Sequence, residues 1–126
     1  MASTEINESL FLRMVTNDRL VLEALSSASQ CYSPYTHSRS GCAIQASDGP
    51  IYSGRYVENA AFNPSMSPLQ VAVSCMNMRH IGEKQTITRA VLVEKPSGIE
   101  QRDVTEMILR SIAPGVELEY FEAERA

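Results

Sequence analysis

The side chains here with the strongest metal-binding or nucleophilic chemistry are three cysteines and two histidines: Cys31, Cys42, Cys75, His37 and His80. Two ligands on one helical face stand four residues apart, whereas Cys75 and His80 stand five apart. His37 and Cys42 have a spacing that is ordinary for unrelated residues, and no nucleophile with a neighbouring base is recognisable. These residues predict no metal site, so we expect buried thiols and hydrogen-bonded or solvent-facing imidazoles.

Composition narrows the class of protein further. An odd number of widely spaced cysteines argues against a disulfide framework and favours a reducing cytoplasm. The 126 residues suffice for one compact domain, and a net charge of -4 disfavours nucleic acid as a partner. No apolar run approaches the ~20 residues that cross a bilayer, and the polar, acidic N-terminus does not resemble a secretory signal. We therefore expect a cytoplasmic protein with no membrane partner.

The elements that would position a site alternate between helices and strands. Residues 10–14 predict a short amphipathic turn, and Asn17 or Asp18 can then cap a helix. The apolar stripe of that helix has the spacing of a packed face: Val21, Ala24, Leu25, Ala28 and Tyr32. Strands over 42–46 and 51–58 flank Asp48-Gly49, a dipeptide that suits a tight hairpin because glycine accepts a positive φ.

The second half continues the alternation. Ser67 and Pro68 are a good N-cap and a good first residue for a helix, and residues 88–94 read as a buried central strand. A last helix precedes a strand over 116–121, and it begins either at a capping box formed by Asp103 and Glu106 or nearer Ser97. We expect the apolar side of that helix to comprise Val104, Met107, Ile108 and Ile112. This order predicts an α/β fold with a mixed sheet and helices on both faces.

Four stretches together resemble the cytidine deaminases. They are Ser33-Pro34-Tyr35, the hairpin ending in ENAAF at 58–62, the helix from Ser67, and the strand-turn-helix over 91–110. SGRYVENAAFNPSMSPLQVAV and RAVLVEK are similar, more narrowly, to the zinc-free C-terminal domain of the two-domain dimeric enzymes. The resemblance implies a three-layer α/β/α sandwich over 18–126, preceded by a linker-like segment over 1–17.

The resemblance also implies where the chemistry would lie. Zinc deaminases use the pattern [HC]-x-E … P-C-x-x-C, in which three residues hold the metal and the glutamate moves protons. In this sequence the pattern falls on Ser67 and Leu69, then on Ser97 and Glu100. No thiolate or imidazole stands at a ligand position, and leucine cannot move a proton. We therefore expect no zinc cofactor and no deaminase activity from this chain alone.

The nucleoside pocket implied by the family is altered as well. Ser38 and Tyr56 stand where the family has an aromatic residue and a ribose-binding asparagine. Glu58 matches the ribose-binding carboxylate, and it either keeps that contact or braces its own loop. Ala61 and Phe62 match a loop that reaches across the interface of the two-domain dimers to close the partner's site; alternatively, Phe62 covers the local core.

The implied function is therefore non-catalytic. The chain would serve as a structural and dimerisation domain that completes the active site of a catalytic cytidine deaminase domain, which converts cytidine or deoxycytidine to uridine or deoxyuridine in pyrimidine salvage. Pro68 and Leu69 would fill the volume left by the metal and the carboxylate. A nucleoside-binding or regulatory module is the alternative, which Glu58 favours and Ser38 and Tyr56 disfavour. We expect a homo-oligomer or a complex with a catalytic domain, because the family packs through apolar surfaces.

Overall fold

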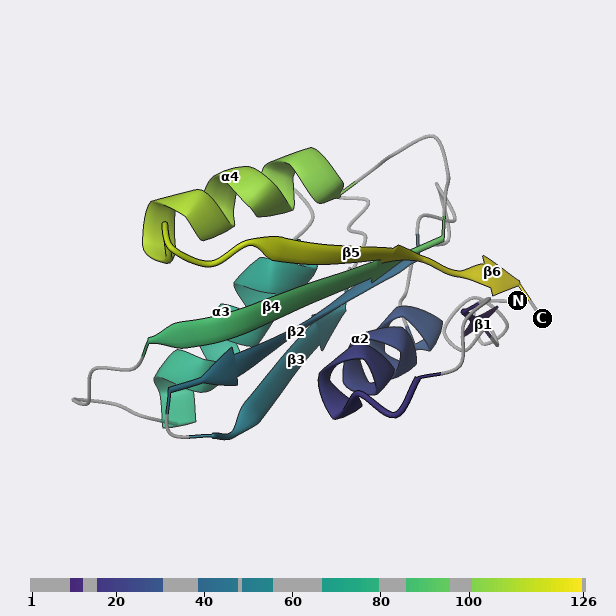
Figure 1. Cartoon of the computed structure of the whole chain (residues 1–126), viewed down its shortest axis with the longest axis horizontal. Helices are drawn as coiled ribbons and strands as arrows, with labels where there is room; N and C mark the ends of the chain where they lie inside the picture. Colours follow the sequence, from purple (N-terminus) through teal and green to yellow (C-terminus); the bar gives the residue numbers. More distant parts are fainter. Residues whose placement is uncertain are drawn as a thin grey trace, which may run out of the picture.

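A mixed sheet with strand order β3-β2-β4-β5 forms the centre of the molecule (Figure 1). The computed structural model describes residues 10–12, 16–30, 39–47, 49–55, 67–79, 86–95 and 101–125. The strands are β2 (Ser40–Ala46), β3 (Ile51–Arg55), β4 (Ile87–Glu94) and β5 (Leu118–Glu122). β2 runs antiparallel to both β3 and β4, whereas β4 and β5 are parallel. The predicted hairpin is present, and Gly49 in its turn has a φ of 109°.

Helices cover both faces of this sheet. α2 (Arg19–Ser29) lies on one face, and α3 (Pro68–Arg79) and α4 (Arg102–Ile112) lie on the other (Figure 1). β4 shows why both faces must be covered: Ala90 and Leu92 pack with α3 and α4, and the alternate residues Val91 and Val93 pack with α2. The predicted three-layer α/β/α sandwich is confirmed. No helix in the described ranges is long and apolar enough to span a membrane.

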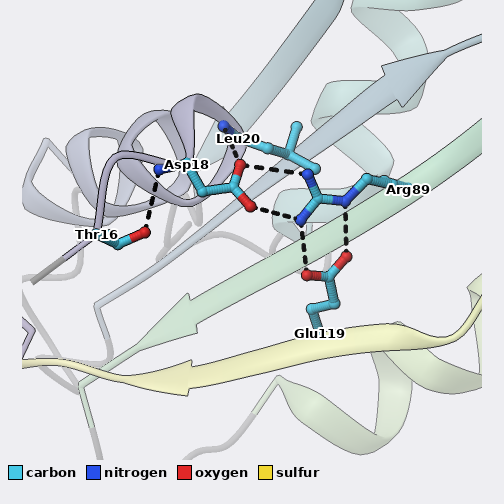
Figure 2. A network of polar contacts seen from close by, with 5 residues as sticks. All are labelled: Thr16, Asp18, Leu20, Arg89 and Glu119. Carbon is cyan, nitrogen blue, oxygen red and sulfur yellow. Dashed lines mark hydrogen bonds and ion pairs between the residues drawn. The ribbon is translucent and has the colours of Figure 1, made fainter. Parts of the chain in front are cut away.

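Asp18 begins α2 as predicted, and it also anchors the helix to the sheet. Its Oδ1 accepts a hydrogen bond of 3.1 Å from the Leu20 backbone N–H. The Arg89 guanidinium on β4 donates to both oxygens of the same carboxylate, with Nη2–Oδ2 at 2.7 Å. Arg89 also donates hydrogen bonds to the Glu119 carboxylate on β5, from Nε at 3.0 Å and from Nη2 at 2.7 Å (Figure 2). One arginine therefore joins the start of α2 to two strands.

The charges of this cluster stabilise one another. The hydrogen bonds from Arg89 are the main cause that holds the pKa of Asp18 below its usual value. The pKa of Arg89 is raised, first by its hydrogen bonds to Glu119 and then by those to Asp18. Because the three side chains are about one-third exposed, we treat the cluster as a geometric clamp of modest energy.

Two local predictions were wrong. Leu10–Phe11 forms strand β1, which pairs antiparallel with β6 (Glu124–Arg125), instead of an amphipathic turn. Further along, α4 has no capping box: its N-cap is Gln101, which makes no side-chain cap, and the helix buries Thr105 and Leu109.

The residues expected on the buried side of α4 mostly face solvent. Val104, Met107 and Ile112 are 47%, 66% and 49% exposed, and Ile108 is half-buried. Only one face of α4 can lie on the sheet, and it is the face that carries Gln101, Thr105 and Leu109, each about one turn after the last. Residues on the opposite side of the helix therefore face solvent.

Candidate functional site

The first half of the deaminase pattern is predicted to fall at the start of α3, where Ser67 closes the helix end with its own side chain. Its Oγ accepts a hydrogen bond of 3.3 Å from the Gln70 N–H. In return, the Gln70 Oε1 accepts one of 3.0 Å from the Ser67 N–H. This reciprocal pair is a capping box, and it satisfies two backbone donors that would otherwise face the site. Ser67 is 4% exposed, so the predicted N-cap is confirmed and the hydroxyl is already engaged.

Leu69, which the resemblance places at the position of the proton-shuttling glutamate, lies in the core. It is 0% exposed and belongs to the cluster between the sheet and α3 that includes Ile44, Ala72 and Met76. Pro68 beside it is also fully buried. These aliphatic side chains bring no group that could bind a substrate or carry a proton, and their contribution here is packing.

Gly54 allows the start of α3 to lie directly on the sheet. A side chain at this position of β3 would overlap the backbone oxygen of Pro68, and its Cβ would come within 2.6 Å of the Ala72 N. Only a residue without a Cβ permits this approach. The close fit places the start of α3, and with it the buried Leu69, directly against the sheet.

The second half of the pattern is predicted to precede α4, where Glu94 closes the helix end from the sheet. Glu94 ends β4 and is fully buried. Its Oε2 accepts a hydrogen bond of 2.6 Å from the Gln101 N–H, and its Oε1 accepts one of 3.0 Å from the Tyr120 hydroxyl. Arg102 stacks over the Tyr120 ring with its guanidinium carbon 4.3 Å from the ring centre. A carboxylate at a helix N-terminus is favoured by the helix dipole and by the free N–H groups there.

Glu94 was not among the residues singled out from the sequence, because a glutamate that ends a hydrophobic strand carries no motif of its own. The signal that could have found it is the burial of its strand: a charged residue in an otherwise aliphatic run of a central strand needs a partner. The remaining candidate positions, Ser97, Glu100, Glu58, Ala61 and Phe62, lie outside the described residues, as do Ser38 and Tyr56.

The residues present at the start of α3 do not fit the zinc ion that the family pattern calls for. A neutral serine hydroxyl is a weak zinc ligand, and that of Ser67 is already used in the helix cap. Leu69 brings no oxygen or nitrogen at all. Within the described ranges, no group of three or more His, Cys, Asp or Glu side chains is placed to hold a metal.

The two described cysteines lie in unlike places. Cys42 on β2 is fully buried, and burial raises the pKa of its thiol to about 12, so it stays protonated and unreactive. Cys75 is exposed on α3. Both are free thiols.

A cavity of about 340 Å³ lies elsewhere, between α4 and the segment that leads into β5. Glu106, Leu109, Val116 and Leu118 are among the residues that line it, whereas Ser67 and Leu69 do not.

Known proteins resemble this chain over most of its length. A family profile described as the cytidine and deoxycytidylate deaminase zinc-binding region matches residues 2–106. A cytidine deaminase of Photorhabdus laumondii is 52% identical over 101 residues, which cover 79% of this chain and 34% of the relative. One of Shewanella sediminis is 46% identical over 110 residues, covering 86% of this chain and 36% of the relative. The chain thus spans about a third of the length of the curated relatives it matches.

Solved structures give the same fold at much lower sequence identity. The cytidine deaminase of Burkholderia pseudomallei superposes with a TM-score of 0.68 at 18% identity, covering 89% of this chain and 92% of that one. That of Mycobacterium tuberculosis gives 0.66 at 17% identity, covering 89% and 91%. One such fold accounts for nearly the whole chain, which is consistent with one domain of a longer deaminase. With the profile spanning most of its residues, this chain belongs to the cytidine and deoxycytidylate deaminase family.

Proposed function

We propose that this chain is a non-catalytic domain of the cytidine deaminase type, whose role is to assemble with another such domain and help complete its active site. The reaction served would be the conversion of cytidine or deoxycytidine to uridine or deoxyuridine. One observation carries the proposal: both helix ends that the family pattern assigns to zinc are closed by this chain's own side chains. Ser67 and Gln70 close α3, and Glu94 closes α4.

The packing around these helix ends supports the same conclusion. A deaminase needs an open metal position and a proton-carrying group beside its substrate. At the corresponding place this chain has the fully buried Leu69, inside a continuous apolar cluster. The free thiols of Cys42 and Cys75 suit the reducing cytoplasm in which we place this role.

The decisive experiment measures metal and turnover on one sample. Protein purified without a metal-affinity tag is analysed for zinc by mass spectrometry and assayed for uridine formation from cytidine. We expect less than about a tenth of an equivalent of zinc and no uridine. Near-stoichiometric zinc together with turnover would overturn the proposal, because the ligands would then have to lie at other positions.

The role in completing a partner's site has its own assay. A catalytic domain from a homologous cytidine deaminase is assayed alone and with this chain, and we expect kcat/KM for cytidine to rise when the chain is added. The substitution Phe62→Ala should remove the gain without reducing the amount of complex, and Phe62→Tyr should retain it, because an aromatic ring suffices to exclude water. An equal gain with Phe62→Ala would contradict this role for the ring.

The alternative function, a nucleoside-binding module, rests on Glu58 and is tested with the same protein. A nucleoside that binds the folded chain must raise its melting temperature. We expect no shift with cytidine for the isolated chain. A shift that Glu58→Gln abolishes would favour the binding module instead.

A further inference from the structure

The helical layer formed by α3 and α4 carries most of the large apolar side chains that are exposed among the described residues. Among the described residues five large hydrophobic side chains are exposed: Leu22, Met78, Val104, Met107 and Ile112. Leu22 lies on α2, whereas the other four lie on α3 and α4. Single exposed apolar residues are ordinary, but a group of them on one layer is typical of a surface that another protein covers.

The outward face of α4 is centred on Met107. This side chain is 66% exposed. It points away from the sheet, because Thr105, two residues before it, and Leu109, two residues after it, both face the core. Asp103 lies one turn before Met107 and Arg110 one turn after it, so both flank Met107 on the helix surface. Arg110 stands at the edge of this surface, where it also lines the cavity beside α4. We call Asp103, Val104, Met107 and Arg110 the α4 face.

The charges of the α4 face have no partners within the part of the chain that the structure describes. Asp103 lies in the first turn of α4 and Arg110 in the last turn. Neither side chain makes an ion pair or a hydrogen bond there, unlike Arg102 and Glu106, which pair with each other at 3.2 Å. The α4 face therefore presents an acid, an apolar centre and a base in a line along the helix.

This arrangement is complementary to itself. If two α4 helices cross antiparallel about a two-fold axis through Met107, Asp103 of each copy lies opposite Arg110 of the other. An interface of this kind uses the same patch on both subunits, and so it requires that the patch match its own image. A partner of unrelated sequence would have no such requirement. The pattern of charges thus points to a second copy of this chain as the occupant.

We propose that the α4 face is a self-association surface, through which two copies of this chain pair with antiparallel α4 helices. The proposal builds on the assembly role suggested above and adds which surface makes the contact. Met107 of the two copies forms the apolar centre, and two Asp103–Arg110 ion pairs set the antiparallel direction. Charged pairs at the edge of an apolar centre mainly decide which orientation and which partner are accepted.

Charge reversal tests self-complementarity directly. Asp103→Arg makes the α4 face wholly basic, and Arg110→Asp makes it wholly acidic, so each variant alone repels its own copy. We expect the dissociation constant of each variant dimer to rise at least about tenfold over that of the wild type. An equimolar mixture of the two variants should form a heterodimer of near wild-type affinity, which native mass spectrometry distinguishes by mass. Far-UV circular dichroism of each variant alone checks that it is folded.

A matched pair of lysine substitutions tests the apolar centre. Met107→Lys should weaken the dimer at least about tenfold, whereas Leu22→Lys, the same kind of change at an exposed apolar position of α2, should leave it unaltered. Three results would each overturn the proposal: a wild-type chain that stays monomeric at its highest soluble concentration, a dimer that neither reversal weakens, or variants whose mixture does not pair. A wild-type monomer that binds a catalytic domain through Met107 would assign the surface to that other occupant.

The test of this surface can fail without the proposed function failing, and the reverse is also true. Zinc content and cytidine turnover are measured on the same wild-type and Met107→Lys samples. Turnover with zinc would overturn the non-catalytic assignment while leaving the pairing result as it stands. A zinc-free, inactive protein that fails the charge-reversal test would overturn only the surface.

Discussion

Replacing Leu69 by glutamate tests whether the place of the family's proton-shuttling carboxylate has become core. In the structure this side chain is 0% exposed and packs in the cluster that contains Cys42, Ile44, Ala72 and Met76. The substitution introduces the residue type that the resemblance to the family predicts at this position. If a hollow remained there, a glutamate would reach water or polar groups, whereas in a packed core it would have neither.

Two costs set the magnitude of the effect. Loss of a buried leucine side chain removes about 2–5 kcal/mol of stability in the comparable change to alanine. Burial of a carboxylate without a partner adds several kcal/mol, part of which the group avoids by taking up a proton. Since a domain is stable by only about 5–15 kcal/mol in total, we expect Leu69→Glu to lose about 5 kcal/mol or more near neutral pH.

The pH dependence has a definite sign. Burial raises the pKa of the introduced carboxyl in the folded chain above its value in the unfolded chain, so the folded state holds the proton more tightly. The deficit of Leu69→Glu relative to wild type is therefore smallest below the unfolded pKa of about 4.3, and it grows as the pH rises through that value.

Urea titration followed by far-UV circular dichroism measures both effects. Leu69→Met is the matched control, because a volume-conserving apolar exchange costs less than about 1.5 kcal/mol. The reasoning would be refuted if Leu69→Glu were as stable as Leu69→Met and its difference from wild type did not change with pH. The glutamate would then occupy a hydrated hollow, and the view that the pocket has been filled would be wrong.

Three further substitutions test the contacts that hold the helices. Glu94→Gln, which replaces one accepting oxygen of a buried carboxylate by an NH2 group and removes its charge, should cost about 2 kcal/mol by urea titration, while Glu122→Gln, an exposed change on β5, should cost nearly nothing. Arg89→Met should cost about 1–2 kcal/mol near neutral pH because it leaves two facing carboxylates. The pKa of Asp18 is lowered from 3.8 in the folded chain, so the stability difference between Arg89→Met and wild type should persist above pH 3.8 and shrink at lower pH. A difference that does not change with pH in urea titrations would contradict the clamp. Gly54→Ala should cost about 3 kcal/mol or more because its Cβ meets backbone, whereas Gly115→Ala, with open space around it, should leave the melting temperature nearly unchanged.

The features that could be predicted from sequence depend on neighbouring residues. The caps made by Asp18 and Ser67 each bind a backbone N–H two or three residues away, and the turn at Gly49 needs only one dihedral angle. The contacts that were missed join distant parts of the chain. Arg89 meets Asp18 across 71 positions of sequence, and Glu94 meets Tyr120 across 26. Periodicity carries no information about such pairs, since only the assembled sheet brings them together.

In the candidate site, too, contacts between neighbouring residues could be predicted and contacts between distant residues could not. The family pattern is predicted to fall on Ser67 and Leu69, and their residue types alone predict that they bring neither a strong metal ligand nor a proton carrier. What closes the second helix end could not be read from that pattern, because Glu94 stands before the turn and belongs to the strand. The assignments of Ser97, Glu100 and Phe62 stay predictions.

The wrong prediction for α4 bears on the assembly proposal. A helix that packs on one side only shows one apolar stripe, and the sequence offered Val104, Met107, Ile108 and Ile112 as that stripe. The structure instead buries Thr105 and Leu109, so α4 is apolar on its outer side as well as its inner side. Such a pattern is expected when a helix packs on one side against its own sheet and on the other side against a second protein surface. The proposed self-association surface gives these outward apolar residues a physical reason.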